Sequence, residues 1–278
     1  MWKSTKTVAL EQHMDAITVA VAAPGRQPPE FCGDIPSTPE AVRKLVGRLD
    51  DGKMDLRFCY EAGPCGYGLY RQLTMMGYDC SVVAPSLSPR RPGERIKTDR
   101  RDALTLARQH RSGDLVAVWV PDEEQEAIRD LVRCREDFKH AERRVRQRLN
   151  SFLLRHGRVY SGGGRWTQAH FRWLETQCFG HPAQQIVFQE YVDGVRHAGR
   201  LVEALEADMV QALETWSLAP VVRSLRALRG GNLIVAMTVM SELGDVTRFD
   251  SPTQLMAYVG QVPSEHSTGR SRRPSRLL

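Results

Sequence analysis

At residues 97–102 the chain reads Lys97-Thr98-Asp99-Arg100-Arg101-Asp102, which places two acids three residues apart in a basic segment. On a helix, positions i and i+3 share a face, so Asp99 and Asp102 would present two carboxylates side by side. Neighbouring carboxylates repel each other unless a positive charge lies between them, and a divalent metal ion supplies that charge. The same pattern also fits a solvated helix face with intrahelical ion pairs, and this stretch alone leaves both interpretations open.

Basic residues are clustered along the chain, whose formal net charge is +6 at pH 7. Guanidinium groups bind phosphate bidentately, so arginine clusters favour a polyanionic partner, although each cluster alone also fits a solvated surface. The residues predicted to bind nucleic acid are Arg90, Arg91, Arg95, Lys97, Arg100, Arg101, Arg270, Arg272 and Arg273. A further basic cluster comprises Arg143, Arg144, Arg146 and Arg148.

Composition argues against several other classes of protein. The 278 residues are 41% hydrophobic, which is typical of a globular chain, and no apolar run approaches the length of a membrane span. The histidines follow no ligand pattern, so a zinc site is not expected. The six cysteines also lack paired metal-ligand spacing, and no signal peptide precedes them, which indicates a reduced, cytosolic compartment: Cys32, Cys59, Cys65, Cys80, Cys134 and Cys178.

The first 122 residues alternate between strand-like and helix-like segments. Two β-rich runs separated by a short polar turn predict a hairpin, and later runs predict helices between further strands. The expected strands are 7–10, 16–22, 56–60, 80–83 and 115–120, and the expected helices are 66–76 and 98–110. This alternation indicates an α/β domain.

The middle of the chain has a seven-residue hydrophobic repeat. It recurs at Leu131, Phe138, Val145 and Phe152, and again at Phe188, Val195, Val202, Met209 and Trp216. Sustained heptads of this kind predict two long helices in a coiled coil. The helices would either fold back on one another or pair with a second subunit.

From about residue 218 the hydrophobic pattern changes again. Short apolar segments separated by glycine resemble a helix-hairpin-helix, which holds a nucleic-acid backbone through main-chain amides. A small structural helical hairpin is the alternative. A basic tail without hydrophobic periodicity follows Gly269.

Two further acids lie near the predicted ends of strands. Glu11 follows the first strand and Glu61 follows the strand at 56–60. Together with Asp99 and Asp102, these carboxylates would be able to hold two Mg²⁺ ions about 4 Å apart, the arrangement for in-line attack on a phosphodiester. Taken singly, Glu11 and Glu61 fit solvated strand ends equally well.

At these residues the chain resembles a known family. The strand-turn-strand at 8–21, the Tyr60-Glu61-Ala62-Gly63 turn and the run at 97–103 are similar to the DEDD transposases of the insertion-sequence type "IS one-ten". That family is related to the Piv-type DNA invertases and to RNA-guided bridge recombinases. The later segments Glu242-Leu243-Gly244-Asp245, Ala257-Tyr258-Val259-Gly260 and Ser267-Thr268-Gly269 resemble the family's C-terminal domain.

The resemblance implies a fold, an activity and partners. It implies a RuvC-like, RNase H-type catalytic domain at 1–122, a coiled-coil insertion at 123–217 and a C-terminal transposase domain at 218–278. Members cut and rejoin DNA strands with Mg²⁺ at an acidic tetrad, here Glu11, Glu61, Asp99 and Asp102, while a serine, here Ser267, forms a covalent link to DNA. In several members a structured RNA guides the choice of site. The resemblance also implies a cytoplasmic, nucleoid-associated homo-oligomer, a dimer or tetramer joined through the coiled coil.

Two departures from the family pattern bear on activity. The first acid is normally Asp, and the extra methylene of Glu11 moves the carboxylate by more than about 1 Å, unless Asp15 compensates. Family members also continue beyond this point, so we expect a truncated C-terminal domain. The alternatives are therefore an impaired remnant that only binds nucleic acid and dimerises, or a nuclease resembling Holliday-junction resolvases that uses the acids without Ser267.

Overall fold

The computed structural model describes residues 4–89, 98–262, 265–268 and 271–274. The chain divides into two compact units, Met1–Val120 and Pro121–Leu278, and each is described by itself.

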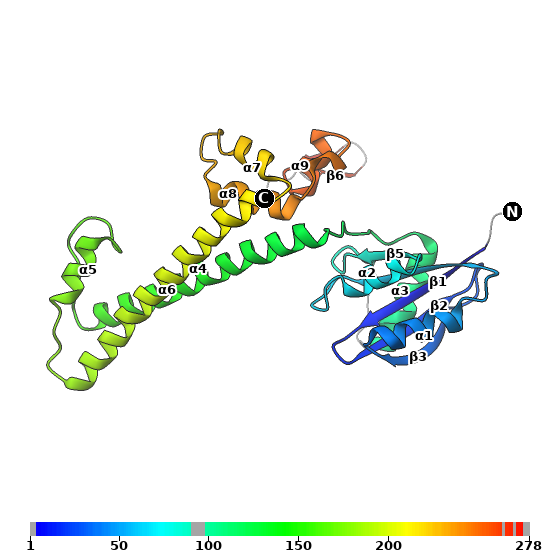
Figure 1. The fold of residues 1–278 in the computed structure, drawn as a ribbon, viewed down its shortest axis with the longest axis horizontal. Helices are drawn as coiled ribbons and strands as arrows, with labels where there is room; N and C mark the ends of the chain where they lie inside the picture. The colour runs from blue at the N-terminus through cyan, green and yellow to red at the C-terminus, as the bar shows by residue number, and fades with distance from the viewer. Residues whose placement is uncertain (1–3, 90–97, 263–264, 269–270, 275–278) are drawn as a thin grey trace. The chain divides into compact units, whose positions relative to one another are not determined.

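The first unit is built on a five-stranded mixed sheet of order β3-β2-β1-β4-β5 (Figure 1). β1 (Thr5–Gln12), β2 (Ala16–Ala22) and β3 (Glu30–Pro36) are antiparallel, and the predicted hairpin of β1 and β2 is confirmed. β4 (Asp55–Glu61) runs parallel to β1, and β5 (Asp79–Val83) runs parallel to β4. The unit is therefore the mixed α/β fold that the sequence predicts.

Helices cover both faces of this sheet. Because strand side chains alternate between faces, Val8 and Leu10 pack in one core cluster with α1 (Pro39–Leu49) and α2 (Gly68–Met75). The other face carries small residues, including Ala9, Ala20 and Cys59, and is covered by α3 (Asp99–Ser112). Small side chains on this face let α3 lie close to β1 and β2.

Three segments of the first unit differ from the sequence prediction. The expected strand at 115–120 is wrong, because among the described residues the segment's β pairing is limited to one isolated bridge, between Val83 and Ala117. The sequence reasoning also missed β3 and α1. β3 is an edge strand interrupted by Gly33, whose φ is 93°, so its pattern lacks regular alternation.

The second unit contains two long helices that fold back on one another (Figure 1). α4 (Glu123–Arg155) and α6 (Pro182–Thr215) are antiparallel, since Phe152 near the end of α4 contacts Phe188 near the start of α6. The connection between them contains α5 (Gln168–Glu175). Of the two arrangements that the heptads left open, the chain adopts the internal hairpin.

The seam between α4 and α6 is less regular than the heptads predict. On α6, Val195, Val202 and Met209 are buried as expected. On α4, Phe138 remains 37% exposed, so its expected burial is wrong. Polar groups occupy the middle of the hairpin instead: the Glu142 side chain is only 3% exposed and forms ion pairs with Lys139 and Arg146 of the same helix. Coiled-coil supercoiling therefore stays a prediction.

The remainder of the second unit is mainly helical. It comprises α7 (Ala219–Leu225), α8 (Leu233–Leu243), the 3₁₀ helix η1 (Val246–Arg248), α9 (Pro252–Tyr258), β6 (Glu265–Thr268) and β7 (Ser271–Pro274). α7 and α8 share a core with the hairpin that includes Met209, Trp216 and Met240. β6 and β7 pair antiparallel, and β7 lies in the basic tail, where no hydrophobic periodicity predicted a strand. The helix-hairpin-helix and the division at residues 122 and 217 stay predictions.

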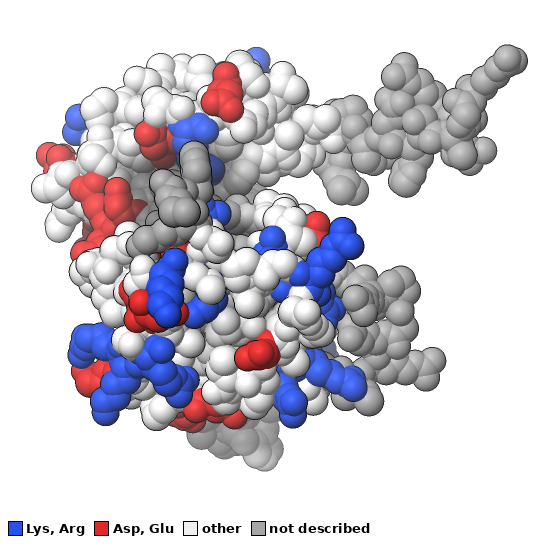
Figure 2. All heavy atoms as spheres, turned by 90° about the vertical axis from the view of Figure 1, so that its right-hand side faces the viewer, with Lys and Arg blue, Asp and Glu red and all other residues white. Residues whose placement is uncertain are grey.

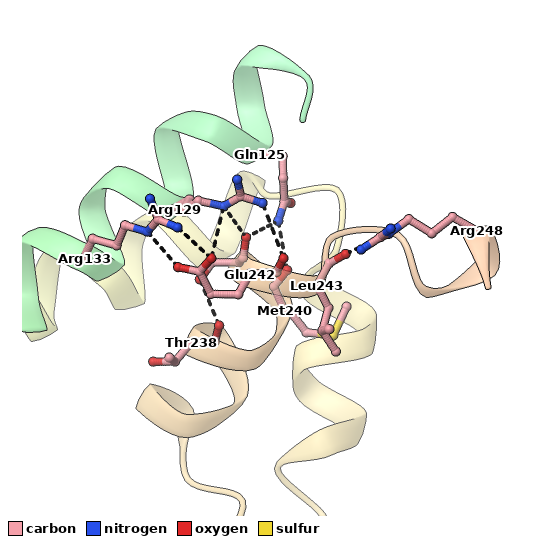
Figure 3. A network of polar contacts seen from close by, with 9 residues as sticks. Gln125, Arg129, Arg133, Thr238, Met240, Glu242, Leu243 and Arg248 are labelled. Carbon is pink, nitrogen blue, oxygen red and sulfur yellow. Dashed lines mark hydrogen bonds and ion pairs between the residues drawn. The ribbon is translucent and has the colours of Figure 1, made fainter. Parts of the chain in front are cut away.

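The end of α8 is held by polar side chains of α4 (Figure 3). Gln125 donates to the carbonyl oxygens of Met240 and Ser241 at 2.8 and 2.7 Å, and Arg129 donates to that of Ser241 at 3.0 Å. Arg133 binds the Glu242 carboxylate through two hydrogen bonds of 2.7 and 2.8 Å. The Met240 carbonyl oxygen also accepts from the Gly244 backbone N–H at 2.9 Å. The last carbonyl groups of a helix often lack intrahelical partners, and the Gln125 and Arg129 side chains supply such partners for the carbonyl oxygen of Ser241.

Candidate active site

Glu11 and Glu61 lie at equivalent places on two neighbouring parallel strands. Ala9 of β1 is in register with Cys59 of β4, and each glutamate lies two residues further along its strand. Residues two apart point to the same face, and adjacent strands are about 5 Å apart. Both glutamates, each half-buried, therefore belong to the face that α3 covers.

The first turn of α3 brings Asp99 and Asp102 to this face. Thr98 caps the helix, its hydroxyl accepting a hydrogen bond from the Arg101 backbone N–H at 3.3 Å. Acids in a first turn are favoured by the partial positive charge of the helix N-terminus. Asp102 directly precedes Ala103, which is fully buried against the sheet, and Asp102 is half-buried while Asp99 is exposed.

His13 links the start of α3 to the end of β1. Its Nε2 lies 3.3 Å from Oδ1 of Asp99, and both side chains are more than half exposed. The contact joins Asp99 to the chain two residues beyond Glu11. Asp15, which was considered as a substitute for Glu11, lies exposed in the turn between β1 and β2.

Four acids from three elements thus approach one end of the sheet. Carboxylate oxygens are the donors that Mg²⁺ prefers, so the chemistry of this set suits a hard divalent cation. Over residues 4–89, 98–262, 265–268 and 271–274, however, no three His, Cys, Asp or Glu side chains lie close enough to hold one metal ion. The acids are gathered at one place but not in a closed coordination shell.

Part of the predicted nucleic-acid surface lies on α3. Arg100 stacks over the ring of Phe31, with its guanidinium carbon 4.9 Å from the ring centroid, and Arg101 is exposed. Basic and acidic side chains are interspersed on the face drawn in Figure 2. Arg90, Arg91, Arg95, Lys97 and Arg270 lie outside the described residues, and Arg272 and Arg273 belong to β7.

Ser267 lies on β6, in the second unit. Its backbone is in register with Arg272 of β7. The four acids belong to the first unit.

Sequence comparison identifies the family. Residues 12–157 match the DEDD transposase family of the IS110 type, described as "Transposase", and residues 222–277 match the "Transposase IS116/IS110/IS902 family". The chain belongs to the IS110/IS116 transposases. The matched ranges contain Glu61, Asp99, Asp102 and Ser267, while Glu11 lies one residue before the first range begins.

Curated relatives agree with this membership. The putative transposase y4qE of Sinorhizobium fredii is 48% identical over 254 residues, which are 91% of this chain and 62% of that protein. The transposase for insertion sequence element IS1533 of Leptospira borgpetersenii is 34% identical over 206 residues, 73% of this chain and 60% of that protein. The probable family 20 transposase of Pseudomonas aeruginosa is 26% identical over 214 residues, which are 75% of this chain and 62% of that protein. The chain spans about three fifths of the length of these relatives.

Two features of this IS110-type transposase were missed by sequence reasoning. His13 was not singled out, although a histidine two residues past a strand-end acid is a recognisable signal. The buried contacts of Gln125 and Arg129 with α8 have no sequence signal, because their partners are main-chain carbonyl oxygens more than a hundred residues away.

Within the described residues, no helix is long and apolar enough to cross a lipid bilayer.

Proposed function

We propose that this chain cuts and rejoins DNA strands of an insertion sequence, with Glu11, Glu61, Asp99 and Asp102 as ligands of Mg²⁺ and Ser267 as nucleophile. The observation that carries the proposal is the equal register of Glu11 and Glu61 on parallel strands beneath the first turn of α3. Membership of the transposase family supports the same reaction class.

We further propose that the first unit is a RuvC-like, RNase H-type domain. The strand order β3-β2-β1-β4-β5, with three antiparallel strands followed by two parallel ones, supports this assignment. The proposed division is a catalytic domain at 1–122, a coiled-coil insertion at 123–217 and a C-terminal transposase domain at 218–278. The heptad helices would also join copies of the chain into a dimer or tetramer.

In the proposed reaction a phosphoryl group passes from one DNA strand to Ser267 and then to another strand, so the number of P–O ester bonds stays the same. The Oγ of Ser267 attacks phosphorus and releases its proton to solvent as the new O–P bond forms. The P–O bond to the departing strand breaks, and the departing oxygen takes up a proton from solvent to become a strand hydroxyl. Attack by a strand hydroxyl on the phosphoserine reverses these changes on a new partner, so rejoining needs no energy-rich cofactor. Mg²⁺, when bound, would neutralise charge at the phosphate and favour loss of the hydroxyl proton.

The covalent link makes this proposal directly testable. Purified protein, Mg²⁺ and labelled element-end DNA should give a protein–DNA adduct that survives denaturing electrophoresis. Ser267→Ala and Asp102→Asn should lose the adduct, while Ser264→Ala and Asp55→Asn should keep it. Asp55 is a matched control because it is an exposed aspartate at the opposite end of β4. Equal adduct from Ser267→Ala would contradict the proposed nucleophile.

We also propose that a structured RNA transcribed from the element directs the choice of DNA site. This part rests on family resemblance. Adding the flanking transcript should raise the yield of joined product on a sequence-matched target. A scrambled transcript should not, and equal yields with both transcripts would contradict guidance.

A binding protein without catalysis is the second candidate. It is favoured by Glu11 where the family has Asp and by the absence, within the described part of the chain, of three ligand side chains around one point. Such a protein would bind nucleic acid with a steep dependence on salt but yield no cut strand in Mg²⁺ or Mn²⁺. A nuclease that uses the acids alone would cut DNA in the Ser267→Ala variant as well.

A further inference from the structure

The charge of α4 reverses along its length. Residues 123–142 contain seven acids, whereas residues 143–174 contain eight arginines and no Asp or Glu. Basic residues in the last turn of a helix complement its dipole, but that effect fades within one turn. The arginine-rich stretch extends through the end of α4 and into α5, so the dipole does not explain it.

Most arginines at the end of α4 have no acid bound to them. Arg143, Arg144, Arg148 and Arg155 are exposed, and among the described residues none of them forms an ion pair. Arg146 differs, since it pairs with Glu142. Like charges left unpaired on one surface repel each other, so this arrangement favours an external anion.

Three of these arginines lie along one face of the helix. Arg144, Arg148 and Arg155 are four and seven residues apart, which corresponds to about 6 and 10 Å along the axis. The phosphates of one DNA strand are spaced about 3.4 Å apart along a duplex. The arginines therefore match the spacing of every second or third phosphate.

Two hollows in the surface are lined by residues of this part of α4. One hollow of about 330 Å³ is lined by Arg144, Arg148, Ser151 and Arg155 of α4 and by Tyr191 of α6. A second hollow of about 300 Å³ is lined by Arg143, Arg146, Asn150 and Trp166, and the Glu142 carboxylate, which pairs with Arg146, also lines it. Amide and guanidinium groups in both hollows, and hydroxyl groups in the first, can donate hydrogen bonds to phosphate oxygens.

Trp166 is held in a strained backbone conformation beside the second hollow. Its φ is 67°, which is rare for a bulky side chain. The guanidinium carbon of Arg146 lies 5.1 Å from the centroid of the Trp166 ring. The backbone N–H of Trp166 donates to Nδ1 of the buried His170 at 3.2 Å. The ring remains partly exposed, so it offers a platform on which an unpaired base can stack.

We propose that this surface, the arginine tip formed by Arg143, Arg144, Arg148, Arg155 and Trp166, binds the phosphodiester backbone of a nucleic acid strand. These residues belong to the second unit and the four acids to the first, and the proposal does not rest on the catalytic one. The arginines bind phosphates, and Trp166 stacks on a base where the strand is unpaired.

The test measures binding of the full chain in EDTA, where no metal-dependent cutting occurs. The probes are a short labelled single-stranded DNA, its duplex and an RNA hairpin, and fluorescence anisotropy gives Kd over a range of salt. Each phosphate contact contributes about 0.7 to the salt slope for a single strand. Arg144→Gln/Arg148→Gln should therefore lower the slope by about 1.4 and raise Kd by about 20-fold at 0.1 M salt.

The control removes two exposed charges elsewhere. Lys44→Gln/Arg48→Gln changes α1, on the sheet face opposite α3, and should alter Kd by less than about twofold. The proposal is overturned if both double variants weaken binding equally, if neither does, or if polyglutamate displaces the probes as well as unlabelled DNA does. Whichever of the three probes depends on the arginines identifies DNA or RNA as the ligand.

Trp166→Leu tests stacking separately, because it leaves the charge unchanged. Binding of the single strand should weaken by about fivefold or more, while duplex binding stays the same. Equal effects on both probes would refute a stacking role for Trp166.

Discussion

The buried contact between Arg129 and α8 gives the sharpest prediction of stability. The Arg129 side chain is only 10% exposed and donates to the carbonyl oxygens of Ser241 and Glu242 at 3.0 and 3.4 Å. Arg129→Met keeps most of the side-chain volume but removes both hydrogen bonds, together with the ion pair between Nε and the Glu242 carboxylate at 3.6 Å. Gln125 still donates to the Ser241 carbonyl in this variant. The free energy of unfolding should therefore fall by about 2 kcal/mol, which is less than the cost of leaving two carbonyl groups without hydrogen bonds.

Arg133 provides a matched control on the same helix. Its side chain is 59% exposed and binds the Glu242 carboxylate at the surface, so Arg133→Met should lower the free energy of unfolding by less than about 1 kcal/mol. Urea unfolding followed by circular dichroism measures both variants, and 2 kcal/mol corresponds to a midpoint shift of about 1 M. Equal losses for the two variants would refute the argument that burial makes the Arg129 contacts strong.

Three further predictions concern stability and reactivity. The hydrogen bond and charge of Arg133 lower the pKa of Glu242, so the stability that this pair contributes is present above the ordinary Glu pKa and is lost as pH falls through the lowered value. Glu242→Gln should therefore flatten the acid side of a plot of urea midpoint against pH, and an unchanged plot would contradict the linkage. Leu149→Ala should lower the free energy of unfolding, measured by calorimetry, by about 3 kcal/mol because Leu149 is fully buried. Leu154→Ala, at a 68% exposed position, should lower it by less than about 0.5 kcal/mol. Burial raises the pKa of the Cys59 thiol and raises that of Cys80 to about 12, so a thiol reagent at pH 8 should label exposed Cys178 first and these two only after unfolding.

Local sequence patterns were enough to predict most of the first unit. The alternation at 16–22 and the apolar run at 56–60 each predict a strand, and β2 and β4 lie there. α1 was missed although its signal is present, since Thr38 caps a helix with Pro39 at its first position and Val42, Leu45 and Val46 facing the core. The predicted strand at 115–120 is wrong because, within the described part of the chain, its backbone pairs with β5 through a single bridge.

Features that depend on distant partners were harder to predict. Phe138 occupies a heptad position, but Arg135 pairs with Glu206 of α6 and Glu142 is buried nearby, so polar contacts take the place of apolar packing. The four acids were predicted as a set from their order in the chain. Their approach to one end of the sheet depends on the parallel pairing of β1 with β4, which no local pattern specifies.

Metal binding tests the central claim, that acids from β1, β4 and α3 act together, most directly. Mn²⁺ is a paramagnetic probe for such oxygen sites, and electron paramagnetic resonance measures the free ion in the presence of the full chain. We predict that Glu61→Gln and Asp102→Asn each weaken Mn²⁺ binding by about tenfold or more, while Asp55→Asn at the opposite end of β4 leaves it unchanged. Equal Mn²⁺ binding by all three variants and the unaltered chain would contradict a shared metal site.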